Sequence, residues 1–192
     1  MGIREWFRTT SRGGENAGVR AWRTAWSQAV ASLDAGAMAD LETALRRTPA
    51  FADDLEIEAE MLDGLRQLLD LERELAASRL PIVETTHRVV GSDRCHFSAP
   101  VSMPDDPAQP TGRLLLTSTR AVFAGGARTP ALPWHAARDV LQSGRDLLFV
   151  FRHANQDGGD GGHRFRCNSF ADALCGAAIA RHLSRTARGS RL

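Results

Sequence analysis

The sequence predicts an α+β fold: a helical hairpin, then an antiparallel sheet that curls or closes on itself, then a capping helix. Apolar residues recur at helical spacing from Val19 to Leu80. After Pro81 they come as short runs broken by Gly, Pro, Asp and Ser, and one amphipathic helix follows the last run. The chain therefore divides into a flexible N-terminus, a helical segment, a sheet-containing domain and a basic tail, at residues 1–17, 18–80, 82–184 and 185–192.

The helical segment carries three apolar stripes, which we interpret as a hairpin with one long arm. The first includes Trp22 and Trp26, and the second ends at Thr48-Pro49, because a proline ring clashes with a preceding helical turn. The third, over about 53–79, has its acids early and its arginines late, which suits the helix dipole. The expected apolar positions are Val19, Trp22, Trp26, Val30, Leu33, Met38, Leu41, Leu45, Ile57, Met61, Leu62, Leu65, Leu68, Leu69 and Leu75.

The stripe with Trp22 and Trp26 has two interpretations. A buried packing face is favoured, because isolated helices need tertiary burial to persist. The alternative is a surface that binds a partner.

After Pro81 the expected strands are short. They cover His87–Val90, Cys95–Phe97, Leu114–Leu116, Ala121–Ala124, Ala131–Leu132, Val140–Leu141, Leu147–Phe151 and Phe165–Cys167. Many short strands with frequent turns indicate an antiparallel sheet. Ser169 and Asp172 form the capping pattern S-x-x-D, which opens a last helix through about His182.

The hairpin at residues 111–126 carries a family resemblance. Its pattern of Gly112, Leu114, Leu116, Thr117, Arg120 and Phe123 resembles the G-x-L-x-L-T-x-x-R-x-x-F hairpin of GRAM and bacterial PH-like domains. The order of later strands and the last helix continues the resemblance over about residues 82–184. It implies a PH-like barrel capped by the C-terminal helix.

Physical reasons can be given for this motif. The hydroxyls of Thr117, Ser118 and Thr119 are suited to bonding the backbone of a tight turn. The stem of Arg120 is expected to lie along the barrel wall, which makes Arg120 a structural residue. Two features depart from the family: the loop Ser98–Pro110 is acidic and proline-rich where phosphoinositide binders are basic, and the helical segment matches no family known to us.

The composition excludes several classes of protein. The net charge is +1, with 10 Arg against 14 acids in residues 1–80 and 14 Arg against 9 acids in residues 81–192, so nucleic acid is not an expected partner. The opposite signs allow the two halves to attract each other. No export signal and no long apolar run occurs, so we expect a cytoplasmic protein whose three cysteines are reduced.

No catalytic, cofactor or metal site is predicted. Asp157, Asp160, His163 and Cys167 cluster in sequence, but glycines between them favour a flexible loop over a metal site. Cys95-His96 are adjacent on a strand, so their side chains point to opposite faces, and we expect one of them to be buried and the other exposed.

We therefore expect a non-enzymatic interaction module that binds a protein partner, with no small-molecule substrate. A groove between the last helix and a neighbouring strand, or an exposed strand edge, would accept the partner. The alternative is a peripheral membrane module that uses Arg181, Arg185 and Arg188, helped by Trp6 and Phe7. The expected interaction surface comprises Arg181, Arg185, Arg188, Trp22 and Trp26.

Overall fold

Three helices, and not a two-armed hairpin, form the N-terminal half of the structure. The computed structural model describes residues 17–47, 55–125, 131–152 and 160–189, so Trp6, Phe7 and the loop residue Asp157 lie outside it. The helices are α1 (Ala17–Ser32), α2 (Ala37–Arg47) and α3 (Glu56–Ala76). The stripes thus locate all three helices, but each one packs against the other two.

Seven antiparallel strands form one open sheet in the order β4-β3-β2-β1-β7-β6-β5. They are β1 (Cys95–Ser102), β2 (Thr111–Thr117), β3 (Arg120–Ala124), β4 (Ala131–Pro133), β5 (Ala137–Ser143), β6 (Asp146–Arg152) and β7 (Asp160–Cys167). The expectation of a closed barrel is wrong, because β4 and β5 do not pair. Edge strand β4 is three residues long and ends in a proline, which has no backbone N–H to donate.

Two local assignments also differ from the sequence prediction. His87–Val90, expected as a strand, contains the 3₁₀ turn η3 (Arg88–Val90), which Gly91 ends at φ 63°. The segment expected as the loop Ser98–Pro110 continues strand β1 as far as Ser102, and the turn follows it. Alternation of burial along β1 explains the extension, since Ala99 and Val101 face the core.

The hairpin of β2 and β3 is buried on both faces. Leu114, Leu116 and Phe123 lie in the main core, as predicted. Leu115 and Val122 on the opposite face lie in a second small core with Val90. Burial on both faces explains the unbroken Leu-Leu-Leu run in β2.

In the turn between these strands only the Thr117 hydroxyl bonds the turn backbone as predicted, whereas the hydroxyls of Ser118 and Thr119 bond the side chains of His96 and Asp93. The Thr117 hydroxyl accepts from the backbone N–H of Arg120 at 3.2 Å and lies 3.0 Å from a carboxylate oxygen of Asp93. Asp93 also accepts from the Thr119 hydroxyl. The guanidinium of Arg120 donates to the Val89 carbonyl at 3.2 Å, so this arginine ties η3 to the hairpin and is structural.

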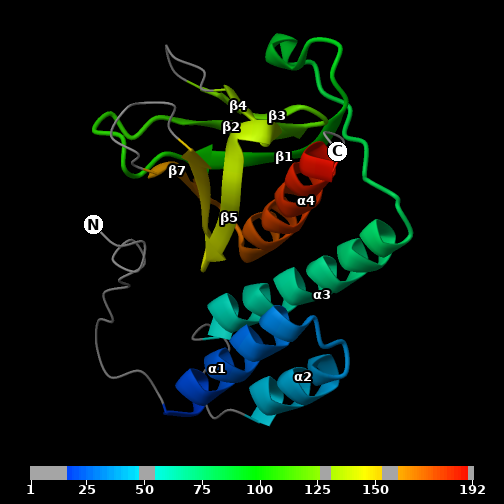
Figure 1. Cartoon of the computed structure of the whole chain (residues 1–192). Coiled ribbons are helices and arrows are strands. Elements are labelled where there is room, and N and C mark those ends of the chain that lie inside the picture. The colour runs from blue at the N-terminus through cyan, green and yellow to red at the C-terminus, as the bar shows by residue number, and fades with distance from the viewer. Residues whose placement is uncertain (1–16, 48–54, 126–130, 153–159, 190–192) are drawn as a thin grey trace.

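Helix α4 (Phe170–Gly189) lies between the sheet and the N-terminal helices, so that the molecule has three layers (Figure 1). The Ser169 hydroxyl accepts from the Asp172 N–H at 3.0 Å, which confirms the predicted cap. One face of α4, with Ala173, Ala177 and Ile179, belongs to the sheet core, whereas Leu174 and Ala178 belong to the helical core. The helix continues past His182, so most of the expected tail is helical.

The two halves are joined by close packing and by charge. At Gly64 of α3, a Cβ atom would lie 3.0 Å from the backbone nitrogen of Ala171, so glycine permits the contact with α4. Glu60 forms an ion pair with Arg145 and accepts from the Phe170 N–H at 2.8 Å. These contacts agree with the opposite charges of the two halves.

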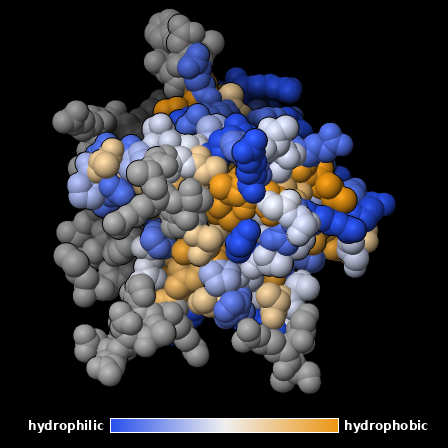
Figure 2. Space-filling view, turned by 90° about the horizontal axis from the view of Figure 1, so that it is seen from above, coloured by the Kyte–Doolittle hydropathy of each residue, from blue (hydrophilic) through white to orange (hydrophobic). Residues whose placement is uncertain are grey.

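The surface seen from above shows apolar patches separated by charged residues (Figure 2). Ile82, just after the helical segment, is the most exposed of the large apolar residues among those described, at 67%. Ile57 is also exposed, contrary to its predicted place in the apolar stripe of α3. Within the described ranges, no helix has both the length and the apolar character to cross a bilayer.

A buried charge cluster on β6 and β7 gives a prediction about pH. Asp146 accepts from Arg166 Nε at 2.8 Å and from Arg164 Nε at 3.1 Å. Burial alone raises the pKa of the Asp146 carboxyl, but hydrogen bonds from Arg166 and Arg164 outweigh it and hold the pKa below its usual value. The contribution of the Asp146 carboxylate to the free energy of unfolding is therefore fully present above the unfolded-state pKa of about 3.9. It is lost as pH falls through the folded-state pKa.

We expect Asp146→Asn to lower the free energy of unfolding at pH 7 by about 2–3 kcal/mol, because it removes charged hydrogen bonds from partly buried guanidinium groups. The difference from the wild type should shrink below about pH 4, where aspartate itself becomes neutral. Urea unfolding of the two proteins at a series of pH values measures the loss at pH 7 and its decrease at low pH. A difference that stays constant down to pH 2 would contradict the assignment of the stabilisation to this carboxylate.

Candidate functional site

Trp22 and Trp26 are packing residues, which confirms the favoured interpretation of the first stripe. They are 4% and 5% exposed. The indole N–H of Trp22 donates to the Leu41 carbonyl at 2.8 Å, and that of Trp26 donates to the Met61 carbonyl at 2.7 Å. Neither ring forms an exposed patch, but each one lines a cavity.

The first cavity is a groove of about 650 Å³ between α1 and α2. Trp22, Leu41 and Ala29 are its buried apolar residues. Small side chains such as Ala21 and Ala25 line it as well, and Asp34 and Asp40 add negative charge. We call it the α1–α2 groove.

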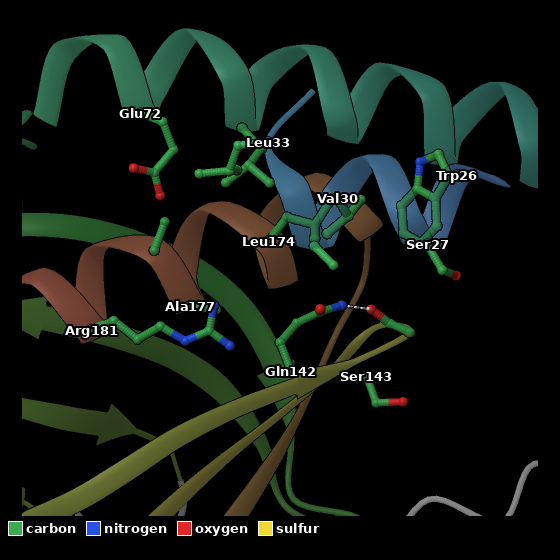
Figure 3. A pocket seen from close by; sticks show the side chains of 14 residues that line it. Trp26, Ser27, Val30, Leu33, Glu72, Gln142, Ser143, Leu174, Ala177 and Arg181 are labelled. Atoms are coloured by element: carbon green, nitrogen blue, oxygen red, sulfur yellow. Dashed lines mark hydrogen bonds between the residues drawn. The ribbon is translucent and has the colours of Figure 1, made fainter. Parts of the chain in front are cut away.

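The second cavity, of about 440 Å³, lies where α1, α3 and α4 meet the turn between β5 and β6. We call it the junction pocket (Figure 3). Its residues are Trp26, Ser27, Val30, Ala31, Leu33, Leu68, Glu72, Gln142, Ser143, Gly144, Leu174, Ala177, Ala178 and Arg181. Helices from one half and a strand turn from the other therefore build it together.

Two opposite charges line the junction pocket. Arg181 reaches it from α4 and Glu72 from α3 (Figure 3). The Nε of Arg181 donates to the Val140 carbonyl at 2.9 Å, which fixes the guanidinium in place. No ion pair joins Arg181 and Glu72, although both residues are among those described.

Leu33 at the pocket has an unusual backbone. It directly follows the end of α1 with φ 53°, and it is 42% exposed, contrary to its predicted place in the apolar stripe. A left-handed conformation at a helix end favours glycine and costs a leucine on the order of 1 kcal/mol. Strained residues of this kind are found more often at functional sites, and Leu33 lines the junction pocket.

The three arginines of the expected interaction surface do not act together. Arg181 belongs to the junction pocket, whereas Arg188 lines a separate cavity of about 250 Å³ with His135 and Arg138. The Nε of Arg188 donates to the Ser184 carbonyl at 3.2 Å. Arg185 is exposed on α4.

The side chain of Arg181 crosses the groove between α4 and β5 and contacts the middle of β5. On the open side of β5, the Val140 carbonyl accepts from Arg181, and the Val140 N–H donates to the Asp139 carboxylate at 2.8 Å. Side chains therefore satisfy both outward backbone groups of Val140, which is a common protection of edge strands. A peptide that paired with β5 here would have to displace Arg181.

The Cys95-His96 pair does not form a nucleophile and base. Both side chains are buried, contrary to the expectation that one would be exposed. The ring nitrogens of His96 bond the Pro81 carbonyl at 2.7 Å and the Ser118 hydroxyl at 2.9 Å, because residues 81–94 fold back over the hairpin. Burial raises the pKa of the Cys95 thiol, so at neutral pH it is protonated.

The other candidate ligands do not converge in the part of the chain that is described. Burial raises the pKa of Cys167 and of Cys175 to about 12 each. His163 packs against the rings of Phe151 and Phe165. No group of three or more His, Cys, Asp or Glu residues among the described ones could hold a metal ion.

No protein-family model matches the chain, and no curated protein matches it either. Sequence reasoning found Trp22, Trp26 and Arg181 but missed Glu72, Gln142 and Leu33 as pocket residues. No local signal identifies them, since the pocket is assembled from four elements far apart in the sequence.

Proposed function

We propose that the chain is a non-catalytic interaction module in which a PH-like unit supports a helical layer that binds a partner protein. The observation that carries this proposal is the α1–α2 groove. It has a floor of Trp22 and Leu41, it is lined by exposed Ala21 and Ala25, and it lies on the layer farthest from the sheet. Small side chains allow the backbone of another helix to approach closely, as in helix-in-groove recognition.

The charge of the groove specifies the partner. Asp34 and Asp40 both line it. The proposed partner segment is therefore an amphipathic helix with an apolar ridge and flanking Lys or Arg residues. Its apolar side chains would pack against Ala21 and Ala25, over the floor formed by Trp22 and Leu41.

Two features support a PH-like identity for residues 82–184. Strands that are neighbours in the sequence pair with each other except β4 and β5, β1 also pairs with β7, and one packed helix follows. Thr117 and Arg120 of the hairpin motif make structural hydrogen bonds, to the turn and to the Val89 carbonyl.

Membrane binding is the alternative, and the described residues give it less support. Of its three arginines, two bond backbone carbonyls through Nε, and they line different cavities. Binding to anionic vesicles that is lost at physiological salt and in Arg185→Ala/Arg188→Ala would favour this alternative.

The test of the proposed function uses two designed amphipathic helical peptides with the same apolar ridge, one flanked by arginines and one by glutamates. We expect the basic peptide to bind the full chain in fluorescence anisotropy. Ala25→Arg should weaken this binding at least about tenfold, since it puts bulk and positive charge in the groove.

Thr24→Arg is the matched control, because Thr24 is exposed on the same helix and does not line the groove. It should change the affinity less than about twofold, which is a few tenths of a kcal/mol. If neither peptide binds, or if Ala25→Arg and Thr24→Arg have equal effects, the groove is not the binding site.

A further inference from the structure

We propose that the junction pocket binds a zwitterionic ligand with a large apolar side chain, that is, a free hydrophobic amino acid or a very short peptide. This site is separate from the α1–α2 groove, so the inference goes beyond the proposed function. Its volume of about 440 Å³ suits a ligand of this size, because small-molecule pockets commonly measure about 300–1,000 Å³.

Arg181 would hold the carboxylate. Its Nε–H already donates to the Val140 carbonyl at 2.9 Å, so the side chain is fixed before a ligand arrives. The two Nη groups have no hydrogen bond to any other described residue. A guanidinium fixed in this way presents two N–H donors to a carboxylate in a planar pair.

Glu72 would hold the ammonium group. It is half-buried on α3, and its carboxylate lies toward the pocket (Figure 3). Its neighbour Arg73 forms an ion pair with Asp70 and not with Glu72. An ammonium group in this half-buried position would meet an acceptor that has no ion pair among the described residues.

The apolar part of the ligand would pack beside the two charged side chains. Val30 of α1, Leu33 just after α1 and Leu174 of α4 lie there (Figure 3). Leu33 holds its exposed side chain at the pocket through a left-handed backbone that a glycine would adopt without strain. A role in covering a ligand explains why a leucine occupies this position.

The first experiment is isothermal titration calorimetry of the full chain with leucine, phenylalanine and leucyl-leucine. Two analogues each lack one charge: leucinamide has no carboxylate and 4-methylpentanoate has no ammonium group. We expect each analogue to bind at least about tenfold more weakly than leucine. Tighter binding of leucyl-leucine than of leucine would identify a short peptide as the ligand, and the reverse would identify a free amino acid.

Substitutions in the pocket test which residue contacts which part of the ligand. Glu72→Gln should weaken leucine and leucinamide but leave 4-methylpentanoate unchanged, because only the first two carry an ammonium group. Leu33→Gly should raise Tm by about 2 °C and yet weaken leucine at least about fivefold. A residue that is only structural would not combine these two effects. Ile57→Ala, which removes an exposed apolar side chain outside the pocket, is the matched control and should leave the affinity unchanged.

Three results would overturn the inference: no binding of any of the zwitterions at millimolar concentration, equal binding of leucine and leucinamide, or equal effects of Leu33→Gly and Ile57→Ala. Ala25→Arg should leave amino-acid binding intact. The junction pocket and the α1–α2 groove can thus succeed or fail independently.

Discussion

Replacing Trp134 by alanine is expected to lower the free energy of unfolding by about 4 kcal/mol, the typical cost of truncating a fully buried aromatic residue. The side chain is 0% exposed, and its ring lies 6.2 Å from that of Phe149, between centroids. Its indole N–H donates to the Thr117 carbonyl at 2.8 Å, and its backbone N–H donates to the Thr119 carbonyl at 3.1 Å. The residue therefore joins the connection from β4 to β5 to the turn of the β2–β3 hairpin.

Urea unfolding followed by circular dichroism measures this loss. Trp134→Phe is the matched control: it keeps most of the apolar volume but leaves the Thr117 carbonyl without its donor, so we expect a loss of about 1–2 kcal/mol. A loss for Trp134→Ala no larger than that for Trp134→Phe would show that packing of the indole contributes little.

Replacing Gly112 by alanine is the second large expected effect, a loss of about 3 kcal/mol or more. A Cβ atom at Gly112 would lie 2.5 Å from the Ala124 carbonyl oxygen and 2.8 Å from the Cα of Gly125. The atoms in the way belong to the backbone of β3 and the residue after it, so no rotamer change relieves the clash. The glycine that begins the hairpin motif is thus required by the close approach of two chains.

Thermal and urea unfolding of Gly112→Ala measure this effect. Gly189→Ala is its control, since a Cβ atom there would meet nothing within 4 Å, and it should change stability by less than about 0.5 kcal/mol. Retention of wild-type stability in Gly112→Ala would mean that β2 and β3 can separate at this end without cost.

Most of the local structure could be predicted from the amino-acid pattern alone. Apolar periodicity located three N-terminal helices, because an α-helix returns to the same face every three or four residues. Hydroxyl groups identified the turn at Thr117, and the S-x-x-D pattern identified the start of α4. The buried role of Trp22 and Trp26 also followed from the period, since an amphipathic helix must cover its apolar face.

Which faces of these elements meet depends on how the whole chain packs. Periodicity placed Ile57 on the apolar side of α3, yet it is exposed, and the buried residues of α3 begin only at Glu58. His96 is buried because residues 81–94 cross the hairpin, and no pattern near His96 shows this crossing. The sheet is open because β4 and β5 do not pair. Strand β4 is only three residues long and ends at Pro133, and on β5 the Val140 carbonyl accepts from Arg181 of α4.

The residues of the junction pocket could not be grouped from the sequence pattern. Glu72, Gln142 and Arg181 come from α3, β5 and α4, and Leu33 follows α1; none of the four stands out in the sequence pattern of its own segment. They come together because Gly64 lets α3 approach α4 and because Glu60 pairs with Arg145 next to the β5–β6 turn. Local spacing fixes which side of a helix is apolar, but which charges face each other across a cavity depends on how separate elements pack.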